Sequence, residues 1–423
     1  MQNKDEKSCN VFKQIFIDHW ENFKKHYPWY DTRHINDLVN KMLNCGNPKY
    51  MGYAEYRCTE CGKDSKVVSL SCKGYLCLSC GKVHTDKWVE QVCNSLIHGM
   101  CYRHIVLTMP TLLCEICRRD KILLNNLPRY GTECLKKFYN SIKRKELKSG
   151  FIIVLQTHGR NGSYNVHLHV IATSGGLDNE NKWHEIKYFP YEQLHRLWQK
   201  YLLKMLSDVL GNKGKADIEG FKKKYPNGFV ANIDTKNHLS GYEVLATYLA
   251  KYVVAPPISL RRILSYNGSK VEYVYKSHRT ERMELEKVYA FDFIERMIQH
   301  IMPPDFKRIR YYGLHLPAKL KKVRRTVENA IRRTGRIIKN TVKVIFSPNY
   351  RYRVKESTGN DPMICSYCQA EMELWIMYHP KYGVFYEGYD DYNKDLETLK
   401  IEIEKINSLK MECSNVEQML LSF

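Results

Sequence analysis

Several features are missing from this chain of 423 residues, and each absence excludes a class of protein. It has no run of about 18 apolar residues, so we expect no transmembrane helix. Residues 1–10 are polar and charged, so we expect no secretory signal peptide. The sequence also lacks the phosphate-binding loop G-x-x-x-x-G-K followed by Ser or Thr, so we expect no nucleotide cofactor.

Acidic residues are scarce relative to basic ones. The chain carries 67 Lys and Arg against 45 Asp and Glu, a formal net charge of +22. This balance favours a polyanionic partner, either a nucleic acid or an acidic membrane surface. Hydrophobic residues make up 43 % of the chain, which is enough to build real cores and excludes a mostly disordered protein. The length indicates two or three domains.

Cysteine is abundant, with fifteen residues, several of them in C-x-x-C pairs. In a chain without a signal peptide this favours reduced thiols and metal ligation over disulfides, and a cytoplasmic location. Two pairs, each followed by glycine, are separated by fifteen residues. Four thiolates at this spacing are typical of a closed, tetrahedral structural zinc site. We therefore expect Cys58, Cys61, Cys77 and Cys80 to bind one zinc ion in a small ribbon.

Three other cysteine features are weaker. Cys72 lies between the two pairs and competes as a ligand, but it breaks the paired spacing. The pair Cys114 and Cys117 falls in an expected helical turn and is interpreted as structural. The pair Cys365 and Cys368 lies almost 300 residues away and lacks the trailing glycine. It could form half of a second metal site, and the sequence leaves its metal binding open.

Hydrophobic periodicity predicts strands mixed with helices but no regular β-α-β alternation, which indicates an α+β fold. The expected strands are 103–108, 151–157, 166–172 and 271–275, and the expected helices lie within 1–50 and over 132–145, 185–210, 240–253 and 291–301.

One expected strand contains two histidines separated by a single leucine. On a strand, His167 and His169 project to the same face, where two imidazoles can chelate one cation. Folding the preceding strand back as a hairpin places Gln156 opposite His167. Gln156 is then a candidate oxygen ligand that favours Mg²⁺ or Mn²⁺, and His158 is its rival.

The expected helix 240–253 carries two tyrosines four residues apart. Tyr248 and Tyr252 fall one turn apart on the same helix face, with Lys251 between them. Further along, residues 307–343 hold thirteen Lys and Arg against a single acid, Glu328. We expect this arm to contact phosphates.

These features in this order resemble the two-tyrosine rolling-circle insertion-sequence transposases (the "IS ninety-one" type) of the HUH endonuclease superfamily. The stretches that carry the resemblance are Cys58 to Cys80, His167-Leu-His169, Tyr248-Leu-Ala-Lys-Tyr252, His300-Ile-Met-Pro303 and Arg310-Tyr311-Tyr312-Gly313. The resemblance implies an antiparallel-sheet nuclease core with packed helices. It also implies three domains: N-terminal helices with the zinc ribbon over 1–98, the core over 99–305, and a basic, mainly helical region over 306–423.

The resemblance further implies a metal-dependent enzyme that nicks and rejoins single-stranded DNA at transposon ends and targets. In this reading Tyr248 and Tyr252 form 5′-phosphotyrosine intermediates, and His167, His169 and Gln156 hold the catalytic Mg²⁺ or Mn²⁺. The expected setting is the bacterial cytoplasm, in association with the nucleoid and not with a membrane. The alternatives are a rolling-circle replication initiator or relaxase, and a zinc-ribbon DNA-binding regulator without catalysis. The expected DNA-contacting residues are Lys251, Arg261, Arg310, Lys321, Lys322, Arg324, Arg325, Arg332 and Arg333.

Overall fold

The computed structural model describes residues 10–97, 99–233, 256–277, 280–333, 351, 355 and 361–388. The chain divides into two compact units, the first of Met1–Leu43 with Lys73–Ser347 and the second of Asn44–Cys72 with Pro348–Phe423. Each unit is therefore built from two segments that are not consecutive in the chain. Within the described parts of the chain, no helix is long and apolar enough to cross a membrane.

The centre of the first unit is a six-stranded antiparallel sheet. Its strands run in the order β11-β4-β5-β3-β7, and β6 pairs with β5. The two longest strands are buried along almost their whole length, which explains their nearly continuous apolar sequence. The strands are β3 (Tyr102–Thr108), β4 (Lys148–His158), β5 (Tyr164–Leu177), β6 (Trp183–Glu185), β7 (Ala231–Ile233) and β11 (Ile309–Gly313).

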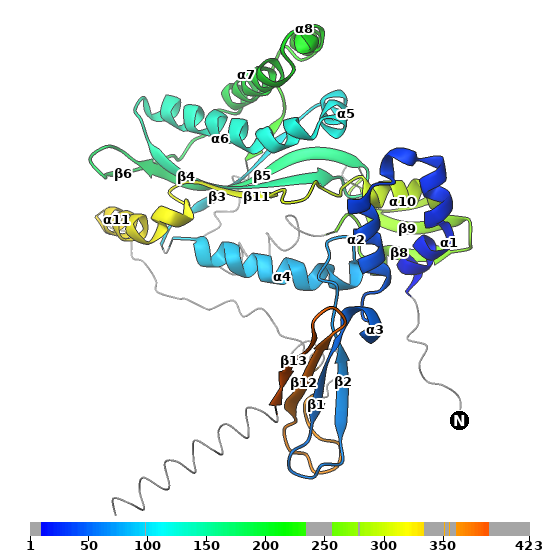
Figure 1. The fold of residues 1–423 in the computed structure, drawn as a ribbon. Coiled ribbons are helices and arrows are strands. Elements are labelled where there is room, and N and C mark those ends of the chain that lie inside the picture. Colours follow the sequence, from blue (N-terminus) through cyan, green and yellow to red (C-terminus); the bar gives the residue numbers. More distant parts are fainter. Residues whose placement is uncertain are drawn as a thin grey trace, which may run out of the picture. The chain divides into compact units, whose positions relative to one another are not determined.

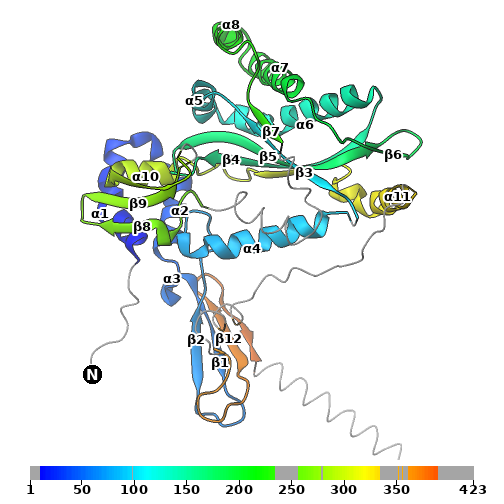
Figure 2. The ribbon, with the colours of Figure 1, turned by 180° about the vertical axis from the view of Figure 1, so that it is seen from behind.

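Helices cover both faces of this sheet (Figures 1 and 2). One face packs on α5 (Thr111–Arg119), α6 (Lys121–Lys143), α7 (Tyr191–Leu210) and α8 (Lys215–Lys224), around residues such as Leu168, Phe138 and Trp198. The other face packs on the end of α4 (Leu78–Ser95) and on α11 (Leu320–Arg332), around residues such as Ile171, Leu96 and Val327. The first unit thus has three layers, with one apolar cluster on each side of the sheet.

A smaller sheet, β10-β9-β8, belongs to the same unit. Its strands are β8 (Ile263–Tyr266), β9 (Lys270–Lys276) and β10 (Met283–Tyr289), and α1 (Val11–His26), α2 (Arg33–Leu43) and α10 (Ala290–Ile298) complete this part. Aromatic side chains join α1 to α10, with Phe12 and Phe293 at 6.2 Å between ring centroids.

The second unit contains α3 (Pro48–Met51) and a four-stranded sheet in the order β13-β12-β1-β2. Its strands are β1 (Tyr53–Arg57), β2 (Ser65–Ser69), β12 (Glu373–His379) and β13 (Gly383–Glu387). The central pair, β1 and β12, is antiparallel and joins segments that lie more than 300 residues apart, with Tyr53 opposite Tyr378.

The predicted α+β class and antiparallel core are confirmed. The expected strands correspond to β3, β4, β5 and β9, while the expected helix 240–253 lies outside the described residues. The region 306–423, expected to be mainly helical, contains β11, β12 and β13 as well as α11 in its described part. One helix begins earlier than predicted, because α6 starts at Lys121 and not near Thr132. Pro128 and Gly131 look like helix breakers, but both are buried, and a Cβ at Gly131 would come 2.7 Å from Leu168 Cδ1. The glycine therefore lets α6 approach the sheet closely.

We predict that Gly313→Ala destabilises the sheet edge. Gly313 ends β11 with φ +62°, and a Cβ there would lie 1.9 Å from the backbone oxygen of Ser149 on β4. Gly268→Ala is the matched control, since its φ is +86° but its Cβ would meet nothing within 4 Å. We expect Gly313→Ala to cost about 1–3 kcal/mol more than the control in thermal or urea unfolding. Equal losses of unfolding free energy in the two variants would show that the backbone of β4 shifts to accommodate the added Cβ without destabilising the sheet.

Candidate active site and metal centres

The two histidines of β5 share one face of the sheet with Gln156 of β4. The strand register pairs Gln156 with His167, as the hairpin argument predicted, and it also pairs Val154 with His169. Gln156 and His169 are buried, and His167 is half-buried. The site therefore has a protected floor and one imidazole at which a ligand from solvent can enter.

Three polar atoms of this face converge on one point. Gln156 Oε1 lies 2.6 Å from His169 Nε2 and 2.8 Å from His167 Nε2, and the two nitrogens are 3.0 Å apart. Adjacent ligands of an octahedral ion with bonds of 2.0–2.1 Å are separated by about 3.0 Å. The spacing of the three atoms thus fits one small divalent ion.

The tautomer of His167 supports the same interpretation. Its Nδ1 lies 3.0 Å from the carbonyl oxygen of Asn165, which can only accept a hydrogen bond, so Nδ1 carries the proton. In the neutral ring the lone pair then sits on Nε2, facing the lone pairs of Gln156 Oε1. Lone pairs that face one another repel unless a cation lies between them. A hydrogen bond from the other ring nitrogen to a carbonyl oxygen, as His167 Nδ1 makes here, is typical of metal-binding histidines.

Burial keeps His169 neutral. Removal from solvent, followed by the nearby His167 and His104, holds the pKa of His169 well below its ordinary value. A histidine must be unprotonated to ligate a metal, so this shift favours the ligating form at neutral pH.

The rival ligand His158 contacts the amide nitrogen of Gln156 and not the point where the three atoms converge. Its Nε2 lies 3.3 Å from the amide nitrogen Nε2 of Gln156, and the ladder is irregular between the two residues. The geometry thus favours Gln156 as the third ligand and gives His158 the role of orienting the Gln156 amide.

Two further buried histidines, His104 and His300, have no role in the sequence prediction, although His300 lies in a stretch that carries the resemblance. His104 Nε2, on β3, lies 2.9 Å from His169 Nδ1 and orients that ring. His300 contacts Thr157 Oγ1 at 3.1 Å and the carbonyl of Gly162 at 3.0 Å, so it fixes the β4–β5 turn. In the sequence, His104 is recognisable only as a member of the predicted strand 103–108. This position points to the site only once β3 is known to pair with β5.

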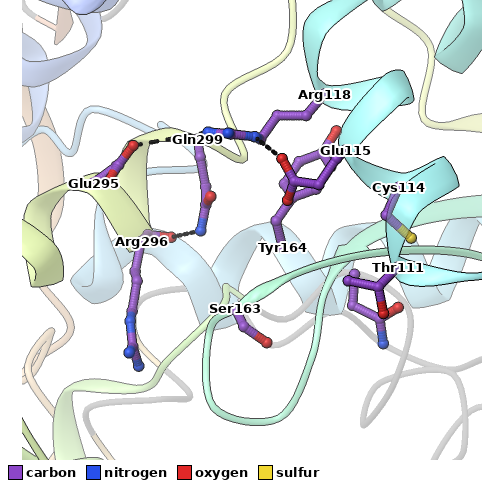
Figure 3. A pocket seen from close by; sticks show the side chains of 10 residues that line it. Thr111, Cys114, Glu115, Arg118, Ser163, Tyr164, Glu295, Arg296 and Gln299 are labelled. Carbon is purple, nitrogen blue, oxygen red and sulfur yellow. Dashed lines mark hydrogen bonds and ion pairs between the residues drawn. The ribbon is translucent and has the colours of Figure 1, made fainter. Parts of the chain in front are cut away.

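A separate pocket of about 630 Å³ opens beside the β4–β5 turn, between α5 and α10 (Figure 3). Arg118 lies between Glu115, at 2.8 Å, and Glu295, at 3.8 Å. Its described lining includes none of the three predicted metal ligands, although Asn165 at its edge is two residues from His167. Its lining balances cations with carboxylates, which does not suit a polyanion.

The cysteines are distributed differently from the prediction. Cys58 and Cys61 cluster with Cys365 and Cys368, and the four Sγ atoms all lie within 4.8 Å of one another. The predicted four-ligand set with Cys77 and Cys80 is therefore corrected. The reason lies in β2, whose five residues carry the chain away from the β1–β2 turn that holds the first pair.

Cys77 and Cys80 belong to a separate cysteine group that could hold a metal ion. They lie at the start of α4, both buried, and the N–H of Cys80 donates to the carbonyl of Cys77 at 3.0 Å. Cys72, set aside by its spacing, donates its backbone N–H to Cys45 Sγ at 3.4 Å. Cys114 and Cys117 are buried on α5, as the structural interpretation predicted.

The expected DNA-contacting residues differ in their surroundings. Lys321, Lys322, Arg325, Arg261 and Arg333 are exposed. Arg324 and Arg310 donate to backbone carbonyls, Arg324 to Asn94 and Leu96 at the end of α4, and Arg310 to Asn125 of α6. Arg332 is the last residue of α11. Tyr248, Lys251 and Tyr252 lie outside the described residues.

Two protein-family models match the chain. A model described as "Putative transposase" matches residues 150–323, which include the histidine strand, and a model described as "Transposase zinc-binding domain" matches residues 15–109. No solved structure matches.

Two curated relatives cover most of the chain. The transposase for insertion sequence element IS801 of Pseudomonas savastanoi pv. phaseolicola is 29 % identical over 359 residues, 79 % of this chain and 82 % of the relative. The "Putative transposase y4qJ" of Sinorhizobium fredii (strain NBRC 101917 / NGR234) is 25 % identical over 355 residues, 78 % of this chain and 86 % of the relative.

The zinc-binding model agrees with the cysteine clusters, which support structural zinc in this chain. The two model matches cover the cysteine-rich segment and the histidine strand. Together with the likeness to the IS801 transposase, these matches support an IS91-type transposase, a kind of protein that acts on DNA.

Proposed function

We propose that this transposase cuts and rejoins single-stranded DNA at the ends of its element through covalent tyrosine intermediates. The observation that carries the proposal is the convergence of Gln156 Oε1, His167 Nε2 and His169 Nε2 to within 3.0 Å of one another. These atoms suit a divalent cation bound by nitrogen and oxygen, Mg²⁺ or Mn²⁺. Such an ion polarises a phosphoryl oxygen and offsets the charge that develops during displacement.

The protein groups would divide the reaction as follows. The phenol oxygen of Tyr248 or Tyr252 attacks the scissile phosphorus, a P–O bond to tyrosine forms, and the bond from phosphorus to the 3′ oxygen breaks. The departing 3′ oxygen ends protonated, and the proton lost by the phenol balances it. A second tyrosine can take the second cleavage while the first remains linked to DNA, so the sequence of steps needs no nucleotide cofactor.

The half-exposed position of His167 supports the entry of a DNA backbone from solvent, whereas His169 and Gln156 form the buried floor. A duplex backbone is held by its partner strand, so a single strand approaches such a recessed point more easily. α11 lies on the same face of the sheet as the histidines, because its Val327 belongs to the same apolar cluster as Val154 and Ile171.

We predict that Tyr248→Phe with Tyr252→Phe abolishes a covalent DNA adduct. The wild-type protein, incubated with Mn²⁺ and labelled single strands from the ends of its element, should give an adduct that survives SDS. Tyr188→Phe with Tyr289→Phe is the matched control, since both residues are exposed and far from the histidines in sequence. An adduct that persists in the first double variant would overturn the proposal, because another residue would then be the nucleophile. No wild-type adduct on any end sequence would also overturn it and would favour a non-catalytic DNA-binding regulator.

We predict that Gln156→Leu lowers Mn²⁺-dependent cleavage at least 100-fold, whereas Gln156→Glu retains it because an oxygen ligand remains. His158→Asn should cost only about 10-fold, as expected of a group that orients a ligand. The measurement is the cleavage rate as a function of Mn²⁺ concentration. A larger loss in the His158 variant than in Gln156→Leu would make His158 the third ligand.

We predict that replacing Lys321, Lys322 and Arg325 with alanine weakens single-strand binding on every sequence. Each phosphate contact contributes about 0.7 to the slope of log K against log salt, so the triple variant should reduce the slope by about 2. Lys222, Lys223 and Lys224 of α8 are the control, because they are equally exposed and α8 packs on the opposite face. Equal effects of the two triple variants would mean that net charge, not α11, governs binding.

A further inference from the structure

The two C-x-x-C pairs of the second unit adopt the same backbone turn. In the first, the N–H of Gly62 donates to the carbonyl of Cys58 at 3.0 Å, and in the second, the N–H of Gln369 donates to Cys365 at 3.2 Å. Gly62 has φ +67° and Gln369 has φ +63°, so the missing glycine of the second pair does not prevent the turn. Both pairs therefore direct two thiols to one side of a tight loop.

The four sulfurs are placed as a metal requires. Cys58 Sγ lies 3.4 Å from Cys368 Sγ and 3.6 Å from Cys61 Sγ, and Cys61 Sγ lies 3.6 Å from Cys365 Sγ. Sulfurs bound to a tetrahedral zinc at about 2.3 Å are separated by about 3.8 Å. A disulfide would hold two sulfurs at about 2.05 Å and leave the others aside.

Other contacts hold the two turns together. The backbone N–H and the hydroxyl of Ser366 both donate to Asp64 Oδ2, at 2.7 and 2.8 Å. Lys66 Nζ donates to the carbonyl of Ile364 at 2.7 Å. The pairing of β1 with β12 continues from these turns, so the two segments share one sheet and one cysteine cluster.

We propose that Cys58, Cys61, Cys365 and Cys368 bind one structural zinc ion that closes a ribbon made from segments far apart in the chain. Binding converts four thiols to thiolates and releases four protons. The zinc-binding family model ends at residue 109, so the second half of this ligand set lies beyond it. The inference stands apart from the proposed nuclease site, and neither depends on the other.

The consequence is a cross-link between residues 310 positions apart, Cys58 and Cys368. A four-thiolate site is closed and has no free position for a substrate, so its role is to hold β12 and β13 on β1 and β2. The first pair alone is half a site, and the ribbon is complete only after the chain has been synthesised past residue 368.

The test is the zinc content of the full-length protein purified under reducing conditions. We expect Cys365→Ser with Cys368→Ser to lose one zinc per chain, Cys58→Ser with Cys61→Ser to lose the same one, and the quadruple variant to lose no more. Cys114→Ala with Cys117→Ala, a C-x-x-C pair in the core of α5, should keep the wild-type content. Cys368→His should also keep it, since zinc accepts imidazole and Cys368 is exposed.

Two results would overturn the proposal: full zinc content after Cys365→Ser with Cys368→Ser, or additive losses from the two double variants. If the serine variants do not fold, alkylation of the wild-type protein decides the question. A chelator should expose all four cysteines to a thiol reagent together, as mapped by mass spectrometry. Exposure of Cys58 and Cys61 without Cys365 and Cys368 would show that the pairs do not share an ion.

Discussion

The candidate active site depends on the register between β4 and β5. Side chains alternate between the faces of a strand, so a slip of one residue would turn Gln156 away from His167 and His169. The register is held by burial on both faces, with Leu168 packed on one side of the sheet and Ile171 on the other. A slip would exchange these apolar residues with the polar ones. The same packing that stabilises the sheet therefore fixes the three candidate ligands.

Local sequence was sufficient to predict this part of the site. The two strands are joined by a short turn, so their pairing follows from the sequence pattern without knowledge of the remaining fold, and Gln156 falls opposite His167. His104 could not be predicted in this way, because β3 reaches β5 only after α5, α6 and β4 have intervened. The choice between Gln156 and His158 depended on an irregularity in the ladder, which alternation alone does not contain.

The cysteines show the opposite limit. A C-x-x-C turn forms from its own residues and gives no information about which other turn will face it. Sequence spacing favours the nearest pair, Cys77 and Cys80. In the structure the partner of the first pair is selected by strand pairing, since β1 has β12 as its neighbour and the turn of Cys365 and Cys368 precedes β12. Long-range antiparallel pairing leaves no local mark in the sequence, so this assignment needed three-dimensional evidence.

The structure also separates the cations of the basic arm into those that bind the fold and those that face outward. Some arginines of the basic arm donate hydrogen bonds to backbone carbonyls. Arg324 does so at the C-terminal end of α4, where a cation also complements the helix dipole. Such residues connect α11 to the fold and are not available to a polyanion. The apolar stripe of α11, with Val327 and Ile331, then fixes which side chains remain outward, and these include Lys321 and Arg325. That stripe packs on the face of the sheet that carries the histidines. In the proposed function, packing as well as charge would therefore decide where a phosphate backbone meets the protein.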